Sequence, residues 1–420
     1  MTSSKPVLSN EREVFMDILR GFAIFGILIA NLTAGGLGWG PNSEVESQFL
    51  LPHLDKQLDF VYTIFIEGKF YSIFSLLFGW GISLQIKRGE TSGNQSIGIV
   101  KRRLMFMLLL GAVHMLIWPG DIVLFYAILG FFLLPFRRFS NKTLVITGMV
   151  LILSPIILYA AKIVWPWVNI PADILRSAGQ YTDQYFFGPI NEDDADAWVH
   201  STSWWDFFLY NISGFFYRFG YLFFVSRIPK VLGMFLLGYV LGRSDFFKNF
   251  YQNKKVIYWI IGLGLFIGLP ANYFLAYYTS NFASDYYGLK LNGLFQTIAY
   301  ALGVVPLGMA YTGMLMVFFQ TQTGKKILSI FAPVGRMAFT NYIMHSLVCQ
   351  FVFLGPGLGY GGLLGTFYVT IFGIFLYILQ ILMSTLWLRY MNYGPAEWIW
   401  RSLTYWKAQP MLRAKVVHPD

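Results

Sequence analysis

The sequence predicts an all-α, polytopic membrane protein with about ten transmembrane helices and both termini in the cytoplasm. The first observation behind this prediction is composition. Of the 420 residues, 56% are hydrophobic and only 12% are charged, and the mean hydropathy is +0.54. Soluble domains carry about 25% charged residues. Too few charges therefore remain to cover the surface of a soluble protein of this length.

The second observation is the number of apolar runs that could cross a bilayer, which takes about 20 residues each. Ten such runs occupy residues 14–38, 60–86, 104–118, 121–136, 143–165, 228–243, 256–278, 293–319, 335–355 and 364–388. The first run is not a cleaved signal peptide, because Asp17 and Arg20 interrupt its apolar region. No repeat, low-complexity tract or linker separates soluble domains.

The third observation is that charge alternates between the loops. Basic residues gather at 87–103, 137–142, 243–255 and 325–326, whereas the loops at 44–55 and 183–196 are acidic. Basic loops stay in the cytoplasm, so this pattern sets the orientation. The formal charge of +10 then reflects topology. We expect the lipid bilayer of a bacterial cytoplasmic (inner) membrane as the environment, and no nucleic acid as a partner.

One aromatic stretch, residues 204–226, does not fit this alternation. It contains Arg218, and counting it as a span would place the basic residues 248–255 outside. We therefore predict an outer interfacial or re-entrant helix there. The single membrane domain of residues 1–420 then divides into helices 1–5 (1–165), an external loop with the interfacial helix (166–227), helices 6–10 (228–388) and a cytoplasmic tail (389–420).

The first span carries a polar stripe. At 100° per residue, Asp17, Arg20 and Asn31 share one narrow face, and Asn31 lies about 16 Å further along the axis than Arg20. Ionisable residues inside a membrane cost about 2.5–3.5 kcal/mol on insertion scales, so they normally mark a site or a pairing. Two interpretations stay open. One is an Asp17–Arg20 pair with a helix–helix hydrogen bond from Asn31, and the other is a cavity wall on which Arg20 contacts a cytoplasmic anion.

The third and fourth spans form an unusually short hairpin. Each is only about 22 Å long, against a hydrocarbon core of about 30 Å, so the turn is expected to lie below the outer surface and leave a depression. His114 and Asp121 flank this turn. A histidine beside a carboxylate in a sheltered pocket is a candidate general base with the group that orients it. The alternative is that Asp121 caps the following helix and His114 hydrogen-bonds locally.

Further polar residues open the second and ninth spans. Glu67 and Lys69 fall at the depth of Asn31 and the hairpin turn, and are candidates for binding a substrate there, although snorkelling would also account for Lys69. Arg336 begins the ninth span and could join Arg20 in holding phosphates, or could anchor the helix at the basic side.

Asn341 and His345 follow in the same span. They lie four residues apart on one helical face, and Asn341 is a third candidate for binding a substrate. No acidic third ligand is near them, so we expect no metal. Cys349 sits in an apolar run and is expected to be a buried thiol.

Several motifs together resemble the YeiB-like family of bacterial membrane proteins, which carry domain of unknown function 418. The matching stretches are Asp17-Ile-Leu-Arg20-Gly21 with Asn31, residues 69–79, His114 with Gly120-Asp121-Ile122, residues 335–342, and residues 394–401. They occur in order from the first span to the C-terminal tail. That family is in turn similar, more distantly, to the transmembrane acyltransferases, including the acyltransferase-3 group and heparan-α-glucosaminide N-acetyltransferase.

The distant resemblance rests on the first span, where those enzymes have Arg, ten residues, then His or Asn, as in Arg20 to Asn31 here. It implies a cytoplasmic acyl-CoA donor and an acceptor approached from the outer side, with Arg20 at the donor and Asn31 at the reacting centre. The lysosomal relative uses a histidine in the loop after the first span. His53 occupies that loop here, but no matching sequence surrounds it, so we expect His114 to be the base.

Three functions follow as hypotheses. The first is acyl transfer from acyl-CoA or acetyl-CoA to a hydroxyl or amine of an envelope glycan, lipid or small molecule, with Asn31 stabilising the thioester oxygen and Arg20 and Arg336 holding phosphates. The second is transport of a small anionic metabolite. Broken helices in matching positions of two halves would support it, and none is evident in the sequence. The third is a non-catalytic scaffold, and an oligomer is compatible with each.

Overall fold

The computed structural model describes residues 14–33, 37, 50–91, 96–188, 201–244, 246 and 254–413. These residues form helices and connecting turns without a named strand, and their only bridge pairing joins Met391 to Leu412. The all-α class is therefore confirmed. The predicted acidic residues 44, 46 and 192–196 and the basic residue 248 lie outside the described ranges.

The helices up to the middle of the chain are α1 (Val14–Thr33), α3 (Pro52–Phe65), α4 (Lys69–Thr91), α5 (Ser96–Met115), α6 (Val123–Leu133), η2 (Leu134–Arg138), α7 (Asn141–Val164), η3 (Pro166–Asn169) and α8 (Ile170–Phe187). Those that follow are α10 (Trp204–Phe224), α11 (Arg227–Arg243), α12 (Lys254–Asn281), α13 (Ala283–Tyr287), α14 (Leu291–Phe318), α15 (Gln322–Leu328), η5 (Ser329–Phe331), α16 (Ala332–Arg336), α17 (Ala338–Phe353), α18 (Thr366–Tyr390) and α19 (Pro395–Tyr405).

Six helical segments in the described part of the chain are long and apolar enough to cross a membrane. They are α1, the continuous segment Pro52–Gly89, α7, α12, α14 and α18. Two bent pairs, α10 with α11 and α15–α16 with α17, raise the number to eight. The short hairpin helices α5 and α6 fail this test, and only their inclusion gives the predicted ten. The count of ten and the cytoplasmic termini stay predictions.

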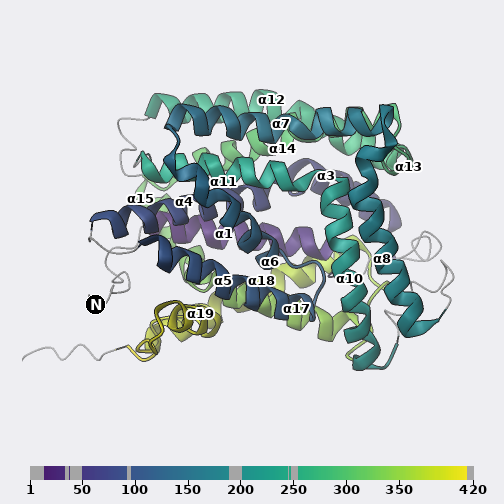
Figure 1. The fold of residues 1–420 in the computed structure, drawn as a ribbon. Helices are drawn as coiled ribbons and strands as arrows, with labels where there is room; N and C mark the ends of the chain where they lie inside the picture. The colour runs from purple at the N-terminus through teal and green to yellow at the C-terminus, as the bar shows by residue number, and fades with distance from the viewer. Residues whose placement is uncertain are drawn as a thin grey trace, which may run out of the picture.

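The spans differ in how much of their surface the protein covers. In an apolar 18-residue stretch of α1, 61% is buried inside the protein, against 28% of the corresponding stretch in α7 and in α12. Figure 1 shows α1 inside the bundle and α7 and α12 along one side of it. Large apolar side chains stand exposed on the outer helices, including Phe266 and Trp259 of α12. A covering of this kind suits lipid and not water, as expected of a membrane protein.

The long helices run side by side between two ends of the bundle (Figure 1). We call these the α19 end, where α15, α19 and the start of α1 lie, and the α13 end, where α13, α8 and α10 lie. The basic segments gather at the α19 end, where Arg243 donates to the carbonyl oxygens of Arg137 (2.6 Å) and Phe139 (2.8 Å). The positive-inside rule makes this the cytoplasmic end of the predicted topology.

Residues 204–226 do not continue the direction of the long helices. In Figure 1, α10 and α8 run across the bundle at the α13 end, and α10 meets α11 at a bend of 73°. The bend is compatible with a broken span as well as with a re-entrant segment, so the interfacial or re-entrant position of residues 204–226 stays a prediction. Residues 166–203, expected as an external loop, instead contain the helix α8 within their described part.

The hairpin of α5 and α6 does not leave the depression that its shortness predicts. The side-chain amide of Asn211, on α10, donates to the carbonyl oxygens of Leu116 (2.8 Å) and Ile117 (3.1 Å) in the turn. A Cβ at Gly214 would overlap Pro119, so α10 rests directly on the turn. The hydropathy of residues 204–226 gives no position for this helix relative to the hairpin, and α10 lies over the turn where the depression was expected.

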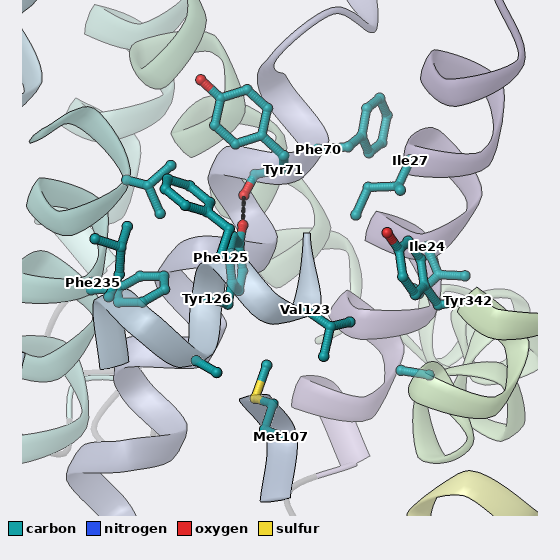
Figure 2. Close-up of a cluster of buried hydrophobic side chains, with 14 of the residues drawn as sticks. Ile24, Ile27, Phe70, Tyr71, Met107, Val123, Phe125, Tyr126, Phe235 and Tyr342 are labelled. Carbon is teal, nitrogen blue, oxygen red and sulfur yellow. Dashed lines mark hydrogen bonds between the residues drawn. The ribbon is translucent and has the colours of Figure 1, made fainter. Parts of the chain in front are cut away.

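The largest apolar core joins α1, α4, α6, α11 and α17. Figure 2 shows part of it, with the hydroxyl of Tyr126 directed at the carbonyl oxygen of Tyr71 (3.1 Å). Tyr126 also bonds the hydroxyl of Ser75, so its buried polar atom is satisfied. Cys349 is a free, buried thiol, as predicted. This core fixes α1, α4, α6 and α17, which are four of the helices around the candidate site.

Candidate functional site

A cavity of about 310 Å³ opens among α1, α4, α5, α6, α16, α17 and α19. Its charged lining consists of five arginines and two carboxylates: Arg20, Arg88, Arg103, Arg336, Arg401, Asp17 and Glu397. Apolar side chains from α1, α4, α5 and α6 line the rest, among them Ile24, Phe74, Met107 and Val123. The cavity therefore offers a cationic region continuous with an apolar one, and we call it the arginine cavity.

A close approach of α1 and α16 brings two of the arginines together. A Cβ at Gly335 would overlap the carbonyl oxygen of Asp17, and a Cβ at Gly21 would overlap that of Phe331. Small residues of this kind let helix backbones touch. Arg20 and Arg336 thereby reach the same cavity, as expected for a phosphate-binding pair. Arg20 also donates to Asp17 (2.7 Å), so the predicted Asp17–Arg20 pair is present, and contact of Arg20 with a cytoplasmic anion stays a prediction.

The C-terminal segment, expected to be a cytoplasmic tail, closes one side of the arginine cavity. Glu397 accepts hydrogen bonds from the backbone amides of Phe339 (2.7 Å) and Thr340 (3.2 Å) and from the Thr340 hydroxyl (2.5 Å). It thus holds α19 on the first turn of α17, where a carboxylate is favoured. Burial raises the pKa of Glu397, and these hydrogen bonds oppose that rise.

Trp400 and Arg401 complete this wall. The Trp400 indole donates to the carbonyl oxygen of Arg103 (2.9 Å), and the Arg103 guanidinium lies 4.2 Å from the centroid of the Trp400 ring. Arg401 lies 4.9 Å from the Tyr393 ring centroid. The aromatic faces orient both guanidinium groups and leave their in-plane N–H donors directed elsewhere.

His114 and Asp121 do meet. The Nδ1 atom of His114 lies 2.7 Å from Oδ1 of Asp121, and its Nε2 lies 2.9 Å from the hydroxyl of Ser346 on α17. All three are buried, at 2%, 1% and 0% exposure. Asp121 Oδ2 also accepts from the Leu124 amide (2.7 Å), so it caps α6 and orients the imidazole at once. A hydroxyl, an imidazole and a carboxylate in this order form the nucleophile–base–orienter arrangement of acyl-transfer enzymes.

Tyr342 separates this triad from the arginine cavity. Its side chain lines the cavity, accepts a hydrogen bond from the Ile122 amide (3.1 Å) and has its ring centroid 5.3 Å from that of His114. Tyr342 and Ser346 are four residues apart on α17 and face the hairpin together. One aromatic side chain therefore stands between the cavity and the imidazole.

The other predicted residues do not line the arginine cavity. Asn31 is half-buried near the end of α1. Asn341 points to α18, where it donates to Ser384 (3.0 Å), and His345 bonds Gln380 (2.8 Å) on the same helix. Asn341 and His345 thus face α18. Tyr342 and Ser346, the residues that follow each of them, face the hairpin of α5 and α6. The substrate roles of Asn31 and Asn341 stay predictions.

Glu67 and Lys69 also lie outside the cavity. Lys69 does not snorkel: it is fully buried, and its Nζ donates to the carbonyl oxygen of Thr63 (2.7 Å). The reason is that α3 and α4 form one continuous segment whose turn folds over the ammonium group. Among the described residues, no group of three or more His, Cys, Asp or Glu side chains could hold a metal ion.

Sequence reasoning missed Ser346, Tyr342 as a separating side chain, and the arginines at 88, 103 and 401. Arg88 and Arg103 were visible but were assigned to topology alone, and Arg401 entered only as the last residue of the motif 394–401. Ser346 had one available signal, since it lies one turn after Tyr342 in the recognised motif 335–342. Its pairing with His114 crosses 232 positions of the chain, and no local pattern encodes such a contact.

Comparisons with known proteins agree on the family. The family described as "Protein of unknown function (DUF418)" matches residues 241–407. "Uncharacterized protein YxaH" of Bacillus subtilis is 32% identical over 98% of this chain and 99% of its own. "Uncharacterized protein YeiB" of Escherichia coli is 27% identical over 96% and 98%, respectively. No solved structure matches significantly. The chain therefore belongs to the YeiB-like DUF418 family.

Proposed function

We propose that this protein is an acyltransferase of the bacterial cytoplasmic membrane that takes its acyl group from acyl-CoA on the cytoplasmic side. The observation that carries the proposal is the arginine cavity, whose inner wall, Tyr342, contacts His114 of the triad. A cationic entrance and an apolar interior suit a donor with several phosphates and an acyl chain. The acceptor is a hydroxyl or amine of an extracytoplasmic glycan, lipid or small molecule.

The cavity carries three more arginines than carboxylates. Asp17 already pairs with Arg20, and Glu397 is engaged by α17, so neither carboxylate is aimed at a ligand alone. Guanidinium groups bind phosphate oxygens with paired, charge-assisted hydrogen bonds. Arg20 and Arg336 from one side, and Arg401 from α19, would hold the phosphates of CoA. The apolar lining from α1 to α6 would receive the pantetheine arm and the acyl group.

The chemistry would begin when Tyr342 turns aside and admits the thioester to Ser346. His114 takes the hydroxyl proton as Ser346 Oγ attacks the carbonyl carbon, the C–S bond breaks, and the CoA thiolate leaves with that proton. His114 then takes a proton from the acceptor as its hydroxyl or amine attacks the acyl-serine, the bond between the acyl carbon and Ser346 Oγ breaks, and His114 passes that proton to Oγ, which leaves the acylated acceptor and free Ser346. Asp121 would hold the imidazole in the tautomer that this needs. Asn31 remains the proposed donor to the thioester oxygen.

The test is release of CoA from acyl-CoA by the purified protein in nanodiscs. We expect saturable binding of acetyl-CoA or a longer acyl-CoA and slow release of free thiol in the absence of an acceptor. A protein that neither binds nor cleaves any acyl-CoA of two to sixteen carbons, while remaining folded, would overturn the proposal.

Transport of an anionic metabolite is the second candidate, and one observation favours it. Two helix pairs are broken at similar angles, α10 with α11 at 73° and α15–α16 with α17 at 75°. Transporters place discontinuous helices at the substrate site. Flux of an anion into proteoliposomes without thiol release would support transport, and thiol release without flux would support acyl transfer.

A further inference from the structure

Three cations gather at the bend between α10 and α11, outside the arginine cavity. Arg218 comes from α10, and Arg227 and Lys230 come from the first turn of α11. Between the two helices, Ser226 has a left-handed backbone conformation with φ of 50°. Non-glycine residues adopt this conformation at a cost. The fold therefore maintains a strained turn at the point where the cations meet.

Two of these cations lie over aromatic rings, and the Glu67 carboxylate acts electrostatically on Arg227 and Lys230 without forming an ion pair with either in the described part of the chain. The Arg227 guanidinium lies 4.6 Å from the Tyr71 ring centroid, and Lys230 Nζ lies 3.7 Å from that of Tyr300. No ion pair joins Arg218, Arg227 or Lys230 to a carboxylate within the described ranges. A cation lying over a ring keeps its N–H donors for another partner.

One buried donor of each arginine is left without a partner. The Nε atoms of Arg218 and Arg227 are both buried and donate to no acceptor in the part of the chain that the structure describes. Lys230 is only 4% exposed. Buried charged donors are normally paired, and two unpaired guanidinium nitrogens at one bend indicate a ligand that supplies the acceptors.

The N-terminus of α11 adds to the positive electrostatic potential at the bend. Ser226 makes no side-chain hydrogen bond to the first turn of α11, a helix of 17 residues. The positive end of that helix therefore points at the bend with uncapped amides. Helix N-termini of this kind bind phosphates when charged side chains assist. The bend combines such a terminus with three cations.

Access is from the α13 end. Figure 1 shows α10 crossing the bundle there and meeting α11. Arg218 and Arg227 are half-buried, and Tyr221 beside Arg227 is 38% exposed. Arg218 also interacts electrostatically with Asp121 and Tyr342, so the bend lies near the triad.

We propose that this bend binds a phosphate or phosphodiester group that enters from the α13 end. The idea that the bend holds the acceptor rests on the proposed acyl transfer. It predicts an acceptor that carries a phosphate beside its nucleophilic group. The binding itself does not depend on that reaction. The phosphate could belong to a lipid headgroup of the outer leaflet or to a soluble phosphate ester, and both present the same acceptor oxygens.

The experiment measures anion binding by the full-length protein with two probes. Glycerol 3-phosphate is titrated against protein in detergent, and retention of phosphatidylglycerol is counted by native mass spectrometry after reconstitution in phosphatidylcholine nanodiscs with and without that lipid. The variants are Arg227→Gln combined with Lys230→Met, and Arg218→Gln alone. Arg176→Gln, an exposed arginine of α8 at the same end, is the matched control.

We expect one probe to bind the wild-type protein and Arg176→Gln equally, and to bind the double variant about tenfold or more weakly, as loss of charge-assisted hydrogen bonds predicts. Binding of glycerol 3-phosphate identifies a soluble ligand, and retention of phosphatidylglycerol alone identifies a lipid. Arg218→Gln should lose less affinity for the probe than the double variant. It provides the test of the site where the double variant does not fold. Wild-type protein that binds neither probe, or variants that bind like wild type, would overturn the inference.

Acyl-CoA binding measured on the same samples separates this inference from the proposed function. Acyl-CoA binding without anion binding at the bend would overturn only the inference. Anion binding at the bend by a protein that ignores acyl-CoA would overturn the proposed function and leave the binding site standing.

Discussion

Cations line both ends of the bundle, but the protein holds them in different ways. In the arginine cavity at the α19 end, Arg20 pairs with Asp17, and Glu397 lies in the same lining. At the bend of α10 and α11, Arg227 and Lys230 lie over tyrosine rings without an ion pair in the described part of the chain. Carboxylates make a cationic pocket tolerable when it is empty, whereas aromatic rings only orient the charge.

The comparison suggests that the arginine cavity and the bend bind different ligands near the triad. A cavity whose positive charge is partly offset by Asp17 and Glu397 can take up and release a donor, which an exchangeable cosubstrate requires. A bend with unpaired donors would keep its anion for longer. His114, Asp121 and Ser346 lie near both regions, and the predictions below test whether they connect them.

The largest effect is expected from His114→Ala. Loss of a general base lowers turnover by about 100- to 10,000-fold, so release of CoA should nearly stop while acyl-CoA binding persists. The measurement is thiol release under saturating acyl-CoA. His53→Ala is the control, because His53 is exposed on α3. If His53→Ala stops the reaction and His114→Ala does not, the base lies in the loop after the first span, and the role of the triad is wrong.

Arg336→Gln should weaken the donor side alone. Removing one charged partner of a phosphate costs about 1.5–3 kcal/mol, so the Kd for acyl-CoA should rise at least about tenfold, with little change in anion binding at the bend. Isothermal titration in detergent provides both values. Arg389→Gln, at an exposed position of α18, should leave the Kd unchanged. Equal effects of the two substitutions would mean that net charge matters and the cavity does not.

Glu397→Ala tests whether α19 belongs to the cavity. The change removes the acceptor of two amides and one hydroxyl on α17, and unsatisfied buried donors cost about 1–3 kcal/mol. We expect a lower Tm and a weaker affinity for acyl-CoA, since Trp400 and Arg401 lose their support. Unchanged affinity for acyl-CoA in a destabilised variant would show that α19 stabilises the fold without forming part of the binding cavity.

Gly335→Ala should give the smallest functional effect through packing alone. The added methyl group would overlap the carbonyl oxygen of Asp17, and overpacking costs about 1–3 kcal/mol. Gly81→Ala, in the same cavity lining, has nothing within 4 Å of its Cβ and should be neutral. Thermal unfolding of both variants measures the difference. Equal Tm values would contradict the close contact of α1 with α16.

The membrane class, the family and the buried Cys349 could be predicted from the sequence, because hydropathy and short motifs are local signals. The pairing of His114 with Asp121 was also within reach, since only seven positions separate the two residues across the turn between α5 and α6. The covering of the hairpin by α10, the wall formed by α19 and the hydroxyl of Ser346 were not. Each depends on contacts between segments about 100 to 300 positions apart, and hydropathy carries no information on such contacts.

The positions of the predicted site residues could likewise be foreseen only where a local sequence signal determines them. Arg20 and Arg336 reached one cavity because glycines in both motifs allow close approach, a cue that the sequence contains. Asn341 did not, because a helix of buried residues has several possible faces and only the position of α18 decides which one is polar. Asn31, Glu67 and Lys69 were grouped by depth alone, and depth does not place residues on the same side of a helix.

The most direct test of the central claim is a search for an acyl group on Ser346. Wild-type protein is incubated with acetyl-CoA labelled in the acetyl group, quenched in acid and digested, and the peptides of α17 are examined by mass spectrometry. We predict one acetyl group on Ser346, matched by an equal amount of free CoA, and none in His114→Ala. Free CoA with Ser346 unmodified in the wild type and full activity in Ser346→Ala would contradict the acyl-serine route.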